Sequence, residues 1–136
     1  MYMSIPEASP MATVPFEHGA VYTRLQIHDV LGGGVQSYLP RRDGRVVCGC
    51  FTQTLNPTAP DVVLVGNRPH VIRDAKLFAA QRYPVPIFIK QGINRWEYVG
   101  NYMVERYSTD PGELQSLRKK AARPHAVGAL FLKRVE

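Results

Sequence analysis

The sequence predicts one α+β domain, built on a curved mixed sheet or small β-barrel of five to six strands with about three short helices. A chain of 136 residues has the length of a single domain. Strand-like and helix-like patterns alternate too irregularly for a doubly wound parallel sheet. Residues 84–107 have the pattern of two strands joined by a Gly/Asn turn. We expect residues 1–15, which contain Pro and Ser, to form a flexible arm, and residues 16–136 to form the domain.

The first half of the chain predicts one helix and two buried strands. Thr23 is a good N-cap and Gly32 a helix stop, so a helix is expected over 24–31. Three glycines follow, and residues 32–40 should be irregular. Asp43-Gly44 predicts a turn. Residues 45–54 and 61–66 are apolar and β-branched, as in buried strands, and two prolines keep 55–60 irregular.

The second half predicts two helices and three strands. Apolar spacing indicates a helix over 72–82, which must end before Pro84. Thr109 or Asp110 can cap a later helix whose first residue is Pro111, and 126–135 should be the last strand. In the strand that ends near residue 107, alternation places a row of residues on one face, and an interior glycine there marks a bulge or a close approach. The row is Trp96, Tyr98, Gly100, Tyr102 and Val104.

Charge and cysteine content indicate a basic protein of a reducing compartment. The net charge is +6, and residues 1–68 are balanced, so all the excess lies in the second half. This asymmetry indicates a polyanionic partner, above all nucleic acid, and a solvated basic surface that only aids solubility stays open as the alternative. Cys48 and Cys50 are one residue apart, too close for an unstrained disulfide on a strand, so we expect both reduced and a cytoplasmic location. No apolar run is long enough to span a membrane.

The sequence contains no strong enzyme motif, so an enzyme is the less favoured class and no cofactor is expected. The three glycines at 32–34 follow a predicted helix instead of preceding one, and no Gly-Lys-Ser/Thr follows them. The four histidines are scattered without metal-ligand spacing. A divalent-metal nuclease would need an acid two residues before Lys90, where Phe88 stands.

Features suited to binding a base are more numerous. Aromatic faces beside amide and hydroxyl groups can hold a base and contact its edge. The candidates are Tyr22, Arg24, Ser37, Tyr38, Asn56, Trp96 and Tyr98. The alternative is that the aromatic row is a core face, in which case the site should lie in the loops 32–40 and 55–60.

The chain resembles the PUA-like group, in particular the SET-and-RING-associated and EVE/YTH-type domains that recognise modified bases. The resemblance is carried by Tyr22-x-Arg24 before a helix, Asn56-Pro57 between two strands, and the run 96–104, WEYVGNYMV. That run is similar to a Tyr-Asp-Gly-Leu-Tyr-x-Val strand, with Val99 in place of the acid. The resemblance implies a curved barrel with a pocket for a flipped base.

The sequence therefore favours a nucleic-acid-binding domain, with DNA preferred to RNA, that reads a modified or flipped base without catalysis. Trp96 and Tyr38 would stack, and Asn56 and Ser37 would contact base edges. Phosphates would face Arg41, Arg42, Arg118, Lys119 and Lys120. Two alternatives stay open: a small enzyme or toxin-like domain with a cleft around Tyr22, Arg24 and Asn56, and a protein-interaction module. The oligomeric state is left open.

Overall fold

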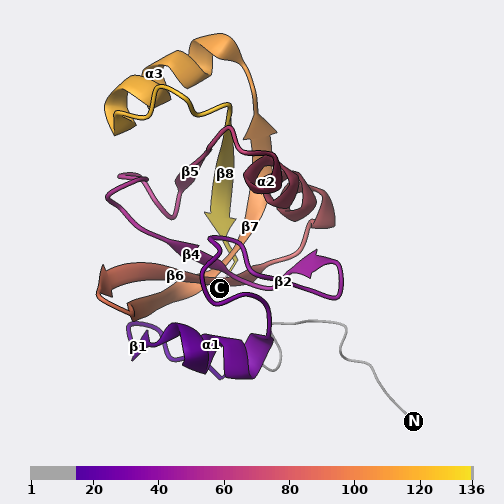
Figure 1. Ribbon diagram of the computed structural model, residues 1–136, viewed down its shortest axis with the longest axis vertical. Helices are drawn as coiled ribbons and strands as arrows, with labels where there is room; N and C mark the ends of the chain where they lie inside the picture. The colour runs from indigo at the N-terminus through magenta and orange to yellow at the C-terminus, as the bar shows by residue number, and fades with distance from the viewer. Residues whose placement is uncertain (1–14, 136) are drawn as a thin grey trace.

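The computed structural model describes residues 15–135, so the predicted arm lies outside the described residues except for Pro15. Within these residues, three helices and a six-stranded mixed sheet with a separate two-stranded hairpin confirm the predicted α+β class (Figure 1). In chain order the elements are β1 (Val21–Tyr22), α1 (Arg24–Leu31), β2 (Arg41–Arg42), β3 (Arg45–Val46), β4 (Gly49–Phe51), β5 (Val62–Val65), α2 (Pro69–Gln81), β6 (Val85–Gly92), β7 (Arg95–Ser108), α3 (Pro111–Ala121) and β8 (Gly128–Arg134).

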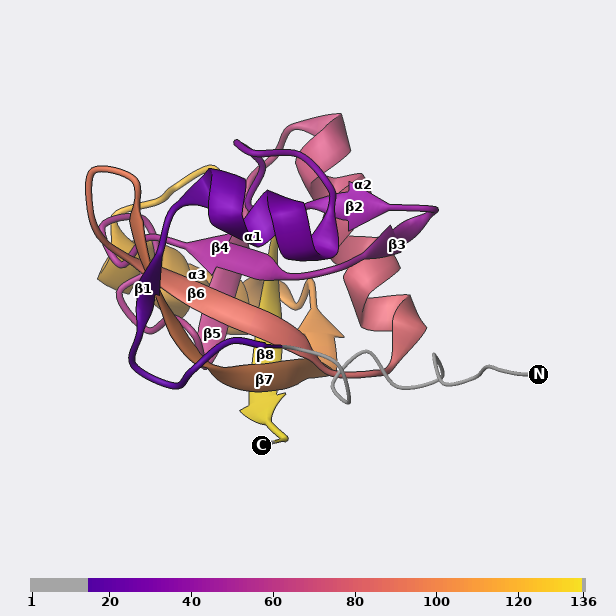
Figure 2. The same ribbon diagram turned by 90° about the horizontal axis from the view of Figure 1, so that it is seen from below.

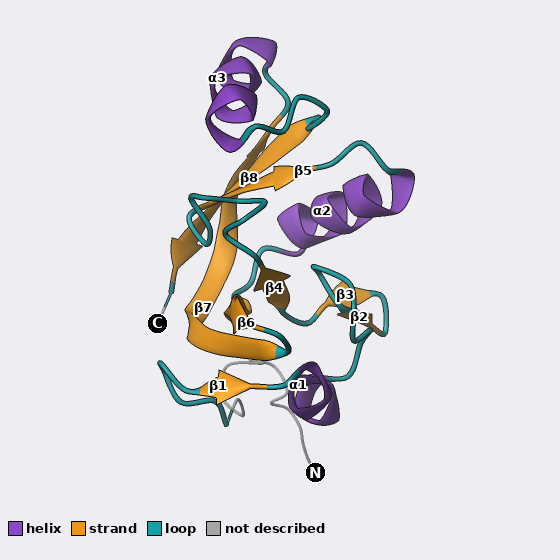
Figure 3. Ribbon diagram, turned by 60° about the vertical axis from the view of Figure 1, so that its left-hand side comes forward, coloured by secondary structure: helices purple, strands orange, loops and turns teal. Residues whose placement is uncertain are grey.

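The sheet is organised around β7, its longest strand. The strand order is β4-β6-β7-β8-β5, and β1 also pairs with β7. The β4–β6 pair is parallel and the other pairs are antiparallel. One end of β7 lies beside β6 and β1 and the other beside β8, with a strong bend between them (Figure 3). The bend gives the sheet the curvature predicted from the sequence.

A bulge at Gly100 accompanies this bend. Ile87 pairs with Gly100 and the next residue, Phe88, pairs with Tyr98, which leaves Val99 as the extra residue. The φ angle of Gly100 is +127°, and a Cβ there would lie 2.8 Å from Nε of Arg134. The bulge and the close approach predicted for this glycine are both confirmed.

The bulge also makes one prediction wrong, because it reverses the side-chain alternation of β7. Trp96 and Tyr98 pack in one apolar cluster, whereas Tyr102 and Val104 pack in another. An extra residue shifts a period-two pattern by one position, so the aromatic row does not lie on a single face.

Each helix covers a different apolar cluster. Phe78 of α2 packs on the main cluster, between α2 and the sheet. Ile27 of α1 packs with Cys48, Cys50 and Phe88, and α1 lies beside β4 when the molecule is seen from below (Figure 2). Leu114 of α3 packs on the end of the sheet formed by β5 and β8. Both cysteines are free and buried, as expected.

Two predicted elements differ from the structure by more than one or two residues at an end. The strand predicted over 45–54 is divided into β3 and β4, because β3 pairs with β2 whereas β4 pairs with β6. Helix α2 begins at Pro69, three residues before the predicted start at Ile72. Proline suits the first position of a helix, where its missing N–H is not needed. The helices at 24–31 and 111–121 are confirmed, with Thr23 and Asp110 as their caps.

Candidate nucleic-acid interface

A cavity of about 470 Å³ opens between the β4–β5 loop, the start of α2 and the segment after α3. This volume lies in the range of small-ligand sites. Its wall combines aromatic, amide and cationic side chains, among them Tyr38, Phe51, Asn56, Arg68 and Arg123. Tyr38 and Asn56 come from the two loops in which the sequence placed the alternative site.

Tyr38 forms a rigid aromatic wall of the cavity. Its hydroxyl donates a 2.7 Å hydrogen bond to the carbonyl oxygen of Val71 in α2. Its ring lies 6.4 Å from the ring of Phe51, centroid to centroid. Burial, with Asp74 nearby, raises the pKa of Tyr38 well above its ordinary value, so the phenol stays neutral. The ring is therefore fixed before any ligand arrives.

Asn56 supplies a polar group with an unused donor. Its side-chain oxygen accepts hydrogen bonds from the backbone N–H of Leu64 at 2.8 Å and from Nη1 of Arg123 at 3.1 Å. Two donors identify that atom as the oxygen. Within residues 15–135 no group accepts a hydrogen bond from the Nδ2 of Asn56. A residue only 7% exposed thus retains an amide donor for a ligand.

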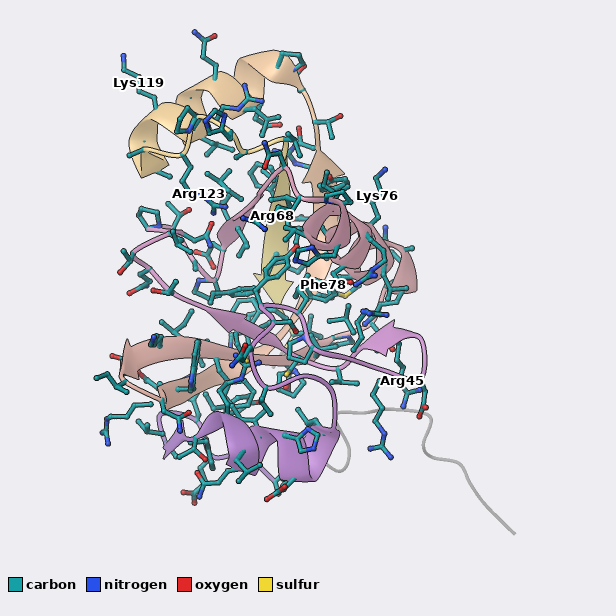
Figure 4. All side chains as sticks on the ribbon, in the orientation of Figure 1. Arg45, Arg68, Lys76, Phe78, Lys119 and Arg123 are labelled. Atoms are coloured by element: carbon teal, nitrogen blue, oxygen red, sulfur yellow. The ribbon has the colours of Figure 1, made fainter. Side chains whose placement is uncertain are left out.

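Two arginines make the cavity electropositive. Arg123 is half-buried, and burial lowers the pKa of its guanidinium. No carboxylate in the described part of the chain lies within 4.0 Å of it. Arg68 stands exposed at the start of α2, whose first turn has no side-chain cap, and both arginines lie near the middle of the molecule in Figure 4. The positive end of that helix dipole adds to their charge.

The other predicted base-binding residues form a second cluster away from the cavity lining. Trp96 is 9% exposed, and the guanidinium of Arg24 lies 5.2 Å from its ring centroid. Arg24 also donates to the carbonyl oxygens of Gly34 at 3.2 Å and Ser37 at 2.9 Å. These contacts attach the glycine-rich loop to α1. Tyr22 and Tyr98 contribute rings to the same cluster.

The cleft expected around Tyr22, Arg24 and Asn56 is therefore not assembled. Asn56 bonds to Leu64 and Arg123, on the cavity side, whereas Tyr22 and Arg24 belong to the cluster beneath α1. Among the residues from 15 to 135, no group of three His, Cys, Asp or Glu side chains could hold a metal ion.

The predicted phosphate-binding residues differ in how they are engaged. Arg41 pairs with the buried Asp74 at 3.0 Å, and Nε of Arg118 donates to a backbone carbonyl at 2.6 Å. Arg42 is exposed beside Asp43. Lys119 and Lys120 are exposed in the last turn of α3 and have no ion-pair partner within the described residues. The two lysines are thus the members of the set best able to meet an anion.

Sequence reasoning missed Phe51, Arg68 and Arg123. Phe51 was taken only as part of a buried strand, and the two arginines lie just outside predicted helices. A signal was present, because each arginine directly precedes a proline at a helix boundary, where side chains tend to be surface-accessible. Their convergence on one cavity depends on packing between distant segments, which spacing along the chain does not reveal.

Helix α3 is attached to β7 by an ion pair that should respond to acid. Arg106 donates two hydrogen bonds to Glu113, at 3.0 and 2.6 Å, and the hydroxyl of Ser108 adds a third at 2.7 Å. These bonds lower the pKa of Glu113 from 4.5 to about 2, and the bond with Arg106 makes the largest contribution. The pair therefore adds stability above pH 4.5, and this contribution is lost as the pH falls towards about 2.

We expect the melting temperature of wild type to fall between pH 5 and pH 2 more steeply than that of Glu113→Gln. The variant lacks the titrating carboxylate, so the fall of its melting temperature with pH reports the titration of all other groups. Circular dichroism melts at matched ionic strength measure the difference. Parallel pH profiles for the two proteins would contradict the assignment. The effect should be modest, because the pair is solvent-exposed.

Comparison with known proteins places the fold in the PUA-like class, as the sequence predicted. The chain resembles KRYPTONITE, solved with mCHG DNA and SAH, at a TM-score of 0.62 and 13% identity. That likeness covers 89% of this chain and 32% of KRYPTONITE, so the chain spans about a third of that protein. It also resembles the SUVH5 SRA domain, solved with hemi-methylated CG DNA, at a TM-score of 0.58 and 18% identity over 90% of each chain.

A further structure of the SUVH5 SRA domain, bound to fully hydroxymethylated CG DNA, has a TM-score of 0.56 and 18% identity. It covers 90% of this chain and 92% of the SUVH5 chain. The chain itself belongs to the family DUF6697, a domain of unknown function, whose model matches residues 9–134. No curated protein matches its sequence. Within the described residues, no helix is long and apolar enough to cross a membrane.

Proposed function

We propose that the chain binds DNA and holds one base, turned out of the double helix, in the cavity beside Tyr38 and Asn56. The observation that carries the proposal is the cavity itself, where a fixed aromatic ring, an unused amide donor and two arginines meet. A flipped base is held by stacking and by hydrogen bonds to its edge. The PUA-like fold, shared with SRA domains solved with methylated DNA, supports the same function.

In this proposal the residues take four roles. Tyr38 and Asn56 contact the base, and Arg68 and Arg123 border the entrance to the cavity. Lys119 and Lys120 contact phosphates, which supply affinity without sequence information. Trp96 and Arg24 act indirectly, since they hold the loop that leads to Tyr38.

A variant that fills the cavity tests the proposal. Gly66 lines the cavity, and a Cβ there would meet only Nη2 of Arg123, at the ordinary contact distance of 3.5 Å. We therefore expect Gly66→Leu to occupy the space without disturbing the core. Gly92→Leu is the matched control, because Gly92 has a similar 3.5 Å contact and lies outside the cavity lining.

The measurement compares two duplexes by fluorescence anisotropy, one fully paired and one with a single base opposite an abasic site. Wild type should bind the second duplex about tenfold more tightly, since an unpaired base is easier to extrude. Gly66→Leu should lose this gain and keep the salt-dependent binding of plain duplex, while Gly92→Leu keeps both. If Gly66→Leu and Gly92→Leu both keep the wild-type preference for the abasic duplex, with unchanged melting temperatures, the proposed site is refuted.

A further inference from the structure

The charged side chains of the cavity lining, Arg68 and Arg123, are both hydrogen-bond donors. The Nδ2 of Asn56 has no acceptor among residues 15–135, and Arg68 and Arg123 can only donate. No aspartate or glutamate is among the lining residues. Side chains that can accept are also present, among them Tyr38, Thr52 and Asn67, but none of them is a carboxylate. A ligand group that lies against Asn56 Nδ2 and Arg123 must therefore be an acceptor.

Arg123 strengthens the preference for an accepting ligand group, because its positive charge is only partly compensated. Its Nη1 donates to the oxygen of Asn56 at 3.1 Å and to the carbonyl oxygen of Leu55 at 3.4 Å. Both partners are neutral, and burial already removes part of its hydration. An amino group placed against Arg123 and Asn56 would set donor against donor, which leaves buried groups unsatisfied.

We infer that the cavity prefers a base with a carbonyl at position 4 of a pyrimidine ring, as in thymine and uracil, to the amino-bearing cytosine counterpart. The inference rests on the proposed function, and it names the class of base that the site takes. Thymine and 5-methylcytosine share the ring and the methyl group and differ at position 4 and in the N3 proton. The O4 of thymine accepts from Asn56 Nδ2, with Arg123 close by; the 4-amino group of 5-methylcytosine does not.

The test uses two duplexes of one sequence, with thymine or 5-methylcytosine opposite an abasic site, so that neither base has a pairing partner to lose. We expect wild type to bind the thymine duplex about tenfold more tightly, the scale of discrimination by one buried hydrogen bond. Equal affinity, or tighter binding of 5-methylcytosine, overturns the inference. Either result leaves the proposed function standing, provided that Gly66→Leu abolishes the tighter binding of abasic duplexes relative to fully paired DNA.

Asn56→Asp gives the decisive second measurement. One carboxylate oxygen can keep the bonds to Leu64 and Arg123, so the fold is preserved, while the other becomes an acceptor in place of Nδ2. The preference should then shift towards 5-methylcytosine by about tenfold or more. An unchanged thymine-to-methylcytosine ratio in a variant with wild-type melting temperature overturns the assignment to Asn56. If wild type binds both abasic duplexes no more tightly than fully paired DNA, the proposed function and the inference are refuted together.

Discussion

A chain carrying Lys119→Gln and Lys120→Gln together is expected to bind DNA about 100-fold more weakly than wild type at about 50 mM salt. Both lysines are exposed in the last turn of α3 and are free of ion pairs among the described residues. Each phosphate contact releases condensed counterions, so two lost contacts reduce the salt slope of log K by about 1.8. Their removal should therefore weaken binding to all sequences alike.

Lys76→Gln is the control for this loss of charge. Lys76 is exposed on α2, and Figure 4 shows it on the opposite side of the molecule from Lys119. Anisotropy titrations at four salt concentrations give the slope for each protein. If Lys76→Gln lowers the slope as much as one α3 lysine does, binding depends on overall charge and not on this face. An unchanged slope in the double variant would exclude α3 from the interface.

Gly100→Ala is expected to lower the free energy of unfolding by about 1–3 kcal/mol, the usual cost of a backbone conformation that side chains disfavour. At φ +127° a Cβ is strained whatever space surrounds it. It would also lie 2.8 Å from the side chain of Arg134, which must move. The substitution therefore acts at the bulge that precedes the change of pairing partner of β7 from β6 to β8.

Gly92→Ala provides the comparison in urea unfolding experiments. Gly92 does not have a left-handed φ angle, and its added Cβ would make an ordinary 3.5 Å contact with Arg95. Its free energy of unfolding should change by less than about 1 kcal/mol. Equal destabilisation by the two substitutions would show that β7 tolerates an alanine at its bulge.

The parts of the fold that were predictable are those specified by neighbouring residues. Thr23 and Gln26 form a reciprocal capping box, and Gly32 ends the same helix with a bond to His28, so both boundaries of α1 are local. Strand β1 has two residues and exists through its pairing with β7. Two residues are too few to show a strand pattern, so β1 could not be predicted from its own sequence.

The candidate site was predictable only in part, for the same reason. The loops that contribute Tyr38 and Asn56 were recognisable from their glycines, prolines and polar side chains. The bond between Asn56 and Arg123 joins residues 67 positions apart, and packing of α3 against the sheet brings them together. Trp96 looked equally suited to a core or a site, and its position depends on a bulge whose effect on alternation cannot be read from the residue types.

The pairing of β7 also has a consequence for the order in which the molecule can form. Strand β1 cannot pair until Trp96 and Glu97 of β7 are present, and β5 pairs with β8, near the end of the described residues. The parallel β4–β6 pair likewise spans the whole of α2. Such contacts between distant positions slow folding, because loop-closure entropy is lost before most of the contacts form. During synthesis, the sheet and the cavity beside it cannot be completed until β8 has left the ribosome.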